Sequence, residues 1–223
     1  TVESLVDGNF DEIVLATGIV PRKLELEGIE SDKVMTYLDV LRDKKPVGDK
    51  VAIIGAGGIG FDVACYLVEK ESLATKPQQW MQNWGVDVGF SEGGALLQKA
   101  GEATPSREIH LLQRKTTKVG AGLGKTTGWI HRKTLQKHGV NMIKGAGYNK
   151  ITDQGLVITL DGEEKELAVD NVIICAGQEP LRELQQGLID RNQSVHLIGG
   201  ADVASELDAK RAIRQGAELA AAI

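Results

Sequence analysis

The chain has 223 residues, of which 42% are hydrophobic and 26% are charged, and its formal net charge at pH 7 is -5. This length is enough for one large or two small domains with a buried core. The negative charge gives no general attraction to nucleic acid or to anionic lipid. Neither is therefore expected as a partner, and any anion site must be local.

The apolar runs are too short to span a bilayer, and no basic region followed by an apolar stretch occurs at the start of the sequence. We therefore expect a cytoplasmic protein. The two cysteines, Cys65 and Cys175, lie far apart in apolar segments, which predicts reduced structural thiols and not a disulfide.

Strand and turn signals dominate the first part of the chain. Residues 10–16 form an apolar run that predicts a buried strand. It leads into residues 17–21, TGIVP, which we interpret as a turn because proline cannot continue a ladder. A short helix is expected over residues 39–45, before Pro46.

A strand, a glycine-rich turn and a helix follow in direct succession. The strand is expected at residues 51–54, the turn at 55–60 and the helix at 61–69. The stretch 72–107, which contains Trp80 and Trp84, is predicted to be a surface insertion with a short helix near residues 95–99.

The remaining elements alternate between strand and helix. Strands are predicted at residues 108–113, 140–144, 172–175 and 195–198, a hairpin at 156–169 around Asp161-Gly162, and helices at 127–138 and 208–223. Residues 176–180, AGQEP, echo the turn pattern of residues 16–21. This alternation predicts an α/β fold with a parallel, doubly wound, Rossmann-like sheet.

The turn at residues 55–60 has the spacing Gly55-x-Gly57-x-x-Gly60. Gly55 allows the sharp bend after the strand, Gly57 lets the backbone approach a pyrophosphate, and Gly60 lets the helix pack closely on the sheet. The amides of Gly58 and Ile59 open the helix and would point towards the phosphates. Because the motif follows a strand and precedes a helix, it predicts a dinucleotide site.

Two cations stand where this fold presents its ribose-reading residue. Arg114 and Lys115 follow the predicted strand at 108–113, and no Asp or Glu occupies that place. Two cations pair well with a 2'-phosphate, which favours NADPH over NADH. The alternative is a solvated basic strand end. The gap after Gly60 exceeds the usual roughly 20 residues, which we attribute to the insertion.

Other candidate motifs are weaker. The segment 120–127, GAGLGKTT, lacks the first glycine and the preceding strand of a P-loop. We interpret it as a loop before the next helix, although Lys118 and Lys125 could contact cofactor phosphate. The four histidines have no partners at metal-ligand spacing, so we expect neither a metal site nor a catalytic residue in this chain.

Taken in order, the segments IVLATGIVP, VAIIGAGGIG, VIICAGQEP and IGGAD resemble the flavoprotein pyridine-nucleotide reductases, in which an NADP domain is inserted into an FAD domain. The segment HLLQRK, the Trp-containing insertion and the ending GGADVASELDAKRAIRQGAELA are similar to the C-terminal portion of the bacterial 2,4-dienoyl-CoA reductases. These are iron-sulfur flavoenzymes of unsaturated fatty-acid β-oxidation. The resemblance implies hydride transfer from NADPH to FAD, then electron transfer through a 4Fe-4S cluster to FMN, where the dienoyl thioester is reduced.

The resemblance also implies cofactor contacts outside the glycine turn. Thr17 and Gly18 would lie near the FAD phosphates or ribose, and Gly177 of the second such turn is also expected to contact a cofactor. Near the C-terminal end, contacts to the ribityl-phosphate region and then to the flavin ring are expected from Gly200, Ala201 and Asp202, and from the backbone of Leu207, Asp208 and Ala209. Amides at the start of the last helix can stabilise the negative charge of reduced flavin.

The sequence departs from this family in what it lacks. It begins after the glycine-rich βαβ unit of the FAD domain, and the cluster cysteines and the FMN barrel are absent. We therefore expect a fragment with a partial FAD-binding domain at residues 1–46, an NADP-binding Rossmann-like domain at 47–169 and a return to the FAD-binding domain at 170–223. The missing N-terminal barrel and cluster region would be its partner.

Two other functions stay open on the sequence alone. The chain could be the NADPH:flavin electron-transfer module of an amine-dehydrogenase-like or ferredoxin-reductase-like flavoprotein. It could also be a non-catalytic module that senses NADP.

Overall fold

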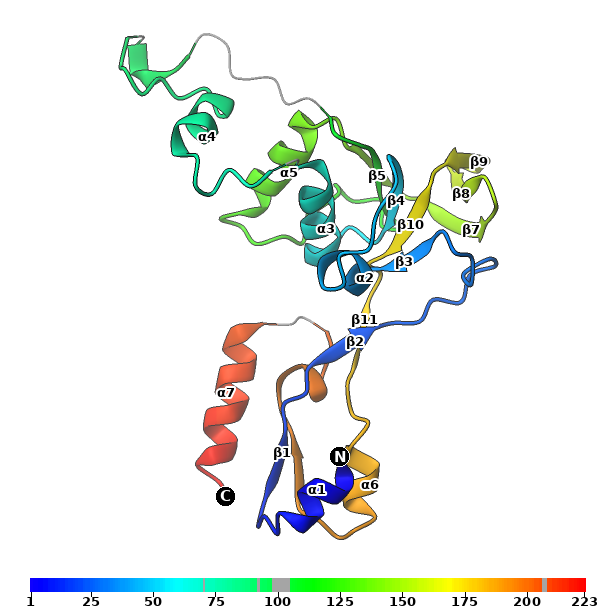
Figure 1. Cartoon of the computed structure of the whole chain (residues 1–223), viewed down its shortest axis with the longest axis vertical. Coiled ribbons are helices and arrows are strands. Elements are labelled where there is room, and N and C mark those ends of the chain that lie inside the picture. Colours follow the sequence, from blue (N-terminus) through cyan, green and yellow to red (C-terminus); the bar gives the residue numbers. More distant parts are fainter. Residues whose placement is uncertain (70, 92, 98–104, 206–207) are drawn as a thin grey trace. The chain divides into compact units, whose positions relative to one another are not determined.

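The computed structural model describes the chain except for residues 70, 92, 98–104 and 206–207 (Figure 1). It contains two compact units. The flanking unit comprises Thr1–Lys23 and Gly177–Ile223, and the central unit comprises Leu24–Ala176. These boundaries differ from the expected domain boundaries, because residues 24–46 and 170–176 belong to the central unit and supply strands to its sheet.

A five-stranded parallel sheet forms the middle of the central unit. Its strands, in spatial order, are β3 (Val34–Thr36), β10 (Asn171–Ile174), β4 (Lys50–Ile54), β5 (Glu108–Gln113) and β6 (Asn141–Lys144). Four of these strands match the predicted ones to within one residue at each end, and β3 was not predicted. The α/β fold with a parallel Rossmann-like sheet is thereby confirmed.

Helices cover one face of this sheet (Figure 1). They are α2 (Tyr37–Leu41), α3 (Gly58–Val68) and α5 (Gly128–Lys137). Phe61 and Leu67 of α3 and Leu135 of α5 are almost fully buried and pack in one cluster with the alternate residues Ile53 and Leu111 of the strands. The period of two in the strands and the helical spacing in α3 thus point their apolar side chains at each other.

A three-stranded antiparallel sheet covers the other face. It consists of β7 (Gly147–Ile151), β8 (Gly155–Leu160) and β9 (Glu163–Ala168). Leu156 and Ile158 pack on Ala52 and Leu112 of the parallel sheet. The predicted hairpin is confirmed, and positive φ angles at Asp161 and Gly162, 52° and 86°, suit its tight turn. In this unit, therefore, strands take the place of a second helical layer.

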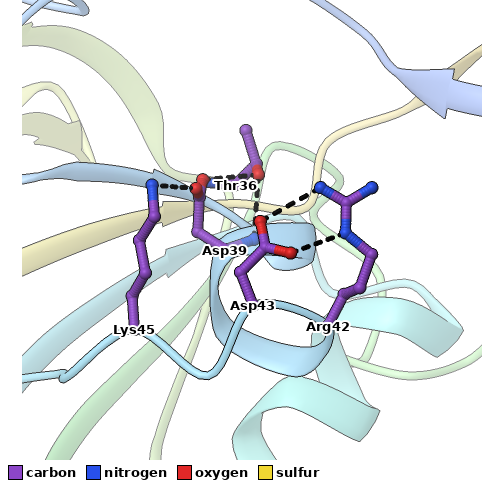
Figure 2. A network of polar contacts seen from close by, with 5 residues as sticks. All are labelled: Thr36, Asp39, Arg42, Asp43 and Lys45. Carbon is purple, nitrogen blue, oxygen red and sulfur yellow. Dashed lines mark hydrogen bonds and ion pairs between the residues drawn. The ribbon is translucent and has the colours of Figure 1, made fainter.

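Polar contacts fix the start of α2 (Figure 2). The Thr36 hydroxyl accepts a hydrogen bond from the Asp39 amide, and the Asp39 carboxylate accepts one from the Thr36 amide at 2.7 Å. The Lys45 ammonium lies 2.5 Å from the same carboxylate. The hydrogen bond from Lys45, followed by that from Thr36, lowers the pKa of Asp39 to about 2. This capping box places the helix start two residues before the predicted one.

The flanking unit is small and holds two short ribbons. In the first, β1 (Ile13–Leu15) pairs in parallel with β12 (Val195–Leu197). In the second, β2 (Ile19–Pro21) pairs antiparallel with β11 (Gln178–Pro180). The sequence predicted turns at 17–21 and 176–180. This was partly wrong, because residues 19–21 and 178–180 form strands. Proline is tolerated in a two-stranded ribbon, where each strand is an edge.

Three helices and a 3-10 turn complete the flanking unit. They are α1 (Val2–Asp7), α6 (Gln185–Ile189), η2 (Gly199–Ala201) and α7 (Ala209–Ala220). Ile13, Leu15 and Leu188 are buried together, and partly buried side chains of α1 pack around them. The last helix was predicted; α1 and α6, of six and five residues, were not.

The insertion at residues 72–107 contains α4 (Pro77–Asn83) and the 3-10 turn η1 (Gly93–Ala95) in its described part. A helix was predicted near residues 95–99, but Ala95 has a φ of 55°, which ends the turn there, and residues 98–99 lie outside the described residues. Across the part of the chain that the structure describes, no helix is long and apolar enough to cross a membrane.

Candidate functional site

The glycine-rich turn joins β4 to α3, and two of its glycines are required by the packing of the protein itself. Gly55 has a φ of 108°, and a Cβ atom there would lie 2.7 Å from the carbonyl carbon and oxygen of Cys175. A Cβ atom on Gly60 would lie 1.8 Å from the Gly55 carbonyl oxygen. These two positions therefore shape the turn and bring α3 close to the sheet, as the spacing predicted.

Gly57 and Gly58 differ from them, because a Cβ atom at either position would have no atom within 4 Å. The φ of Gly57 is -83°, a value that any residue adopts. Nothing in the fold thus demands glycine here. The absent side chains leave space in front of the N-terminus of α3 for a group that does not belong to the chain.

The amides at this helix start are free to bind such a group. No side chain caps α3 at Gly57, and the first turn closes with the bond from the Phe61 amide to the Gly57 carbonyl, 3.0 Å. The amides of Gly58, Ile59 and Gly60 precede that bond, so they have no partner within the helix. Together with the helix dipole they form a binding point for an anion such as a phosphate.

A pocket of about 580 Å³ opens at this turn. It is lined by Ala56, Gly57 and Gly58 of the turn, by Gln113, Arg114 and Lys115 at the end of β5, and by Thr117, Lys118, Gly120, Ala121, Gly122 and Leu123 of the loop before α5. The structure therefore brings Arg114 and Lys115 to the same pocket as the glycine turn. None of these lining residues is acidic, and three are cationic.

The sheet explains why these segments meet. Strands β4 and β5 are parallel neighbours, with Ile54 opposite Leu112, so the chain leaves both strands at one edge of the sheet. The Gln113 side chain then donates to the backbone carbonyls of Lys115 at 2.9 Å and Thr117 at 2.7 Å, which folds the chain beside the turn.

The loop before α5 is held on the pocket by both neighbouring helices. Arg132 of α5 donates to the Gly120 carbonyl at 2.9 Å. A Cβ atom on Gly120 would lie 2.6 Å from the Phe61 ring of α3, so the loop backbone lies directly on that ring. Lys118 lines the pocket, whereas Lys125 does not. Strand β5 does lead into this loop, contrary to the expectation that no strand precedes it, but the P-loop interpretation still lacks its first glycine, because Val119 stands at that position.

In the flanking unit, five of the residues expected near FAD gather where β1 and β12 end. Thr17 donates its hydroxyl hydrogen bond to the Leu181 carbonyl at 2.6 Å. A Cβ atom on Gly200 would lie 3.2 Å from the Cα atom of Gly18, so the two backbones approach closely. The Asp202 carboxylate accepts from Gln215 of α7 at 2.7 Å, and Ala201 is buried in the same turn.

The other residues expected near a cofactor lie elsewhere in this unit. Gly177, with a φ of 90°, precedes β11 and accepts a hydrogen bond from the Arg22 amide at 3.2 Å. Asp208 caps α7 by accepting from the Lys210 amide at 3.0 Å, and Ala209 is the first residue of that helix. Leu207 lies outside the described residues.

Both cysteines are free thiols. Burial is the largest cause that raises the pKa of Cys65 to about 12, and burial also raises that of Cys175 to about 12. A thiol with such a pKa stays protonated at neutral pH, which makes either side chain a poor nucleophile.

Residues 2–207 match the family model described as pyridine nucleotide-disulphide oxidoreductase. The chain belongs to this family. Among curated proteins it is 30% identical over 200 residues to the cinnamate reductase of Clostridium sporogenes, and 25% identical over 200 residues to the metal reductase of Desulforamulus reducens. These matches cover 90% of the chain but 25% and 29% of the two relatives, so the chain spans less than a third of their length.

Solved structures show the same fold. A 2-naphthoyl-CoA reductase complex superposes with a TM-score of 0.73 at 22% identity, over 97% of this chain and 27% of that one. Histamine dehydrogenase from Rhizobium sp. 4-9 superposes with a TM-score of 0.69 at 16% identity, over 98% of this chain and 32% of that one.

Proposed function

We propose that the central unit binds NADPH in the pocket at the glycine turn. The observation that carries this proposal is the combination of an open helix start at Gly57 and Gly58 with two cations, Arg114 and Lys115, in one pocket. The pyrophosphate would meet the amides of α3. The volume of about 580 Å³ lies within the range of small-molecule sites. Family membership supports a pyridine nucleotide as the ligand.

The charges favour the phosphorylated form of the nucleotide. A carboxylate at the end of β5 would bind a free 2'-hydroxyl, but this pocket has Arg114 and Lys115 there, with Lys118 beside them. An arginine can hold a phosphate through two parallel hydrogen bonds, and a nearby lysine adds charge. NADPH is therefore proposed over NADH.

The flanking unit is proposed to contribute part of an FAD site. Thr17 and Gly18 would face the phosphates or ribose, and Gly200, Ala201 and Asp202 the ribityl phosphate. Gly18 supports this role, because a Cβ atom there would have no atom within 4 Å and the absent side chain leaves its backbone open to a ligand, whereas glycine at position 200 is explained by its packing on Gly18 and Ile19. When bound, the flavin supplies a two-electron acceptor for the hydride of NADPH. The chain's own part would be to orient both cofactors.

The whole protein is proposed to be an NADPH-dependent 2,4-dienoyl-CoA reductase of unsaturated fatty-acid β-oxidation, with FMN and a 4Fe-4S cluster held outside this chain. The sequence resemblance supports this reading. The likeness to a cinnamate reductase and to a 2-naphthoyl-CoA reductase is consistent with an unsaturated acyl substrate. The likeness to histamine dehydrogenase supports a second candidate, an amine-oxidising flavoprotein with the same module.

Substrate-dependent turnover of the full-length parent protein tests the proposal. Oxidation of NADPH would be followed without oxygen after addition of 2,4-hexadienoyl-CoA, with crotonyl-CoA and free hexadienoic acid as controls. We expect turnover with the dienoyl thioester and an enoyl-CoA product. Turnover only with an amine and an artificial electron acceptor would replace this substrate assignment with the second candidate, while leaving the nucleotide site untouched.

A further inference from the structure

A second pocket of the central unit, of about 290 Å³, lies between α3, α4 and α5. It is lined by Cys65, Glu69, Leu73, Trp80, Asn83, Trp84, Ile130, His131, Thr134, Lys137 and His138. None of these residues lines the pocket at the glycine turn. The proposed nucleotide site therefore does not account for it, and we refer to it as the tryptophan pocket.

Aromatic rings form one wall of the tryptophan pocket. The ring centroids of Trp80 and Trp84 are 6.0 Å apart at an interplanar angle of 42°, and Trp129 meets Trp84 edge-on at 6.4 Å. These are the three tryptophans of the chain. The face of an indole ring carries negative charge, and among aromatic side chains it binds cations most strongly.

Further negative charge comes from the ends of the three helices. The C-cap residues of α3, α4 and α5 are Glu69, Trp84 and His138, and all three line the tryptophan pocket. The C-terminal end of a helix carries a partial negative charge, to which α3 and α5, with 11 and 10 residues, contribute most. The Glu69 carboxylate adds a full negative charge.

One cation of the chain, the Lys137 ammonium, already lies in the tryptophan pocket. The Lys137 ammonium lies 5.2 Å from the centroid of the Trp84 ring and donates a hydrogen bond to the Asn83 carbonyl. The Lys137 side chain is half-buried, and burial followed by the nearby charge of Lys133 lowers its pKa. The Trp84 ring and the Asn83 carbonyl thus hold an ammonium group here, although burial and Lys133 make its charged form less favourable than in water.

We propose that the tryptophan pocket binds small organic ammonium cations, which replace the Lys137 ammonium against the Trp84 ring and the Asn83 carbonyl. The aromatic wall would hold the apolar body of the ligand, and Glu69 with the helix ends would hold its charge. We expect an anion of the same shape to bind more weakly, because the Glu69 carboxylate and the helix ends oppose it even though Lys137 lines the same pocket. This site is independent of nucleotide binding and of the reaction of the whole protein.

Tryptophan fluorescence tests the proposal directly, because every tryptophan of the chain lines or adjoins this pocket. The chain would be titrated with benzyltrimethylammonium chloride, with sodium phenylacetate as the anionic probe and benzyl alcohol as the neutral one, at constant ionic strength. We expect saturable quenching by the cation, and binding at least about fivefold weaker for the other two probes. Equal or tighter binding of phenylacetate, or no saturation with the cation, would overturn the proposal.

Substitutions of the two charged residues of the pocket should change its affinity for the cation in opposite directions. Glu69→Gln should weaken binding of the cation about threefold or more, whereas Lys137→Met should strengthen it because the internal competitor is removed. Trp84→Leu should weaken it about fivefold, measured by calorimetry. Glu163→Gln and Lys144→Met, outside the pocket, are matched controls without effect. Unchanged circular dichroism and NADPH affinity would show that each variant is folded. Weaker binding of the cation to Lys137→Met would show that the Lys137 ammonium does not compete with the ligand, and would refute the inference.

Discussion

Replacing Gly57 with valine would place a branched side chain in the space in front of α3. A Cβ atom there has no neighbour within 4 Å, and the backbone angles suit any residue. Valine is a poor N-cap, so we expect a loss of about 1 kcal/mol in the free energy of unfolding. Binding should suffer far more, because the side chain would keep the pyrophosphate from the amides. Losing two charge-assisted hydrogen bonds costs at least about 3 kcal/mol, or more than about 100-fold in affinity.

Gly60→Ala should have the opposite effect, with a large loss of stability as its main consequence. Its methyl group would lie 1.8 Å from the Gly55 carbonyl oxygen, which forces α3 away from the sheet. We expect a destabilisation of about 3 kcal/mol or more, at the upper end of overpacking costs. Calorimetric NADPH titrations and urea unfolding of both variants would separate the two roles, with Gly93→Val, also free of neighbours within 4 Å, as the control. Wild-type NADPH affinity in a folded Gly57→Val variant would refute this reasoning.

Three further predictions concern stability, thiol reactivity and flavin content. Because the pKa of Asp39 is about 2 in the folded chain and near 3.8 in the unfolded chain, its contribution is complete above about pH 5 and is lost as pH falls towards 2. Asp39→Asn should thus lower the free energy of unfolding at pH 7 by about 1 to 2 kcal/mol, with a smaller difference in melts at pH 3.5. Cys175, which is buried, should react with Ellman's reagent at pH 8 only after denaturant is added, and Cys65, which is partly exposed but has a raised pKa, should react more slowly than in the unfolded chain; fast labelling of both thiols in the native chain would contradict this expectation. The 223-residue chain should not retain FAD at one per chain after purification, which absorbance at 450 nm would check.

The middle of the parallel sheet could be predicted from the sequence because its central strands are almost entirely buried. β4, β5 and β10 have side chains facing apolar layers on both sides, so they appear as continuous apolar runs. The glycine turn could also be predicted from the sequence. Its spacing is typical of a turn in which the helix packs closely on the sheet and the amides at the helix start are left open to a ligand. Arg114 and Lys115 lie in the same pocket as the glycine turn because they directly follow β5.

Elements that depend on distant partners could not be predicted. β2 and β11 are three residues each and exist only because they pair with each other, although more than 150 residues separate them. β3 is an edge strand with a single partner, β10, and β7 contains a register shift between Tyr148 and Lys150 that breaks its alternation. Local pattern carries little information about such pairings.

The loop at 117–123 shows the same limit within the site itself. Its sequence indicated only a loop, and its position on the pocket depends on Arg132, twelve residues beyond Gly120, and on the ring of Phe61 in another helix. The glycine with a positive φ at Gly120 was a signal in principle. The sequence could not show, however, that the backbone at Gly120 packs on the ring of Phe61.

The nucleotide preference is the most direct test of the proposed NADPH site. NADPH and NADH would be titrated calorimetrically, at one fixed salt concentration, into the wild-type chain, the Arg114→Ala/Lys115→Ala variant and a Lys125→Ala control, whose side chain does not line the pocket. The double variant should lose about 10- to 1,000-fold in NADPH affinity, because exposed charge-assisted bonds to the 2'-phosphate disappear, while NADH affinity and the control stay unchanged. Equal losses for both nucleotides, or no loss for either, would show that these cations do not bind the 2'-phosphate.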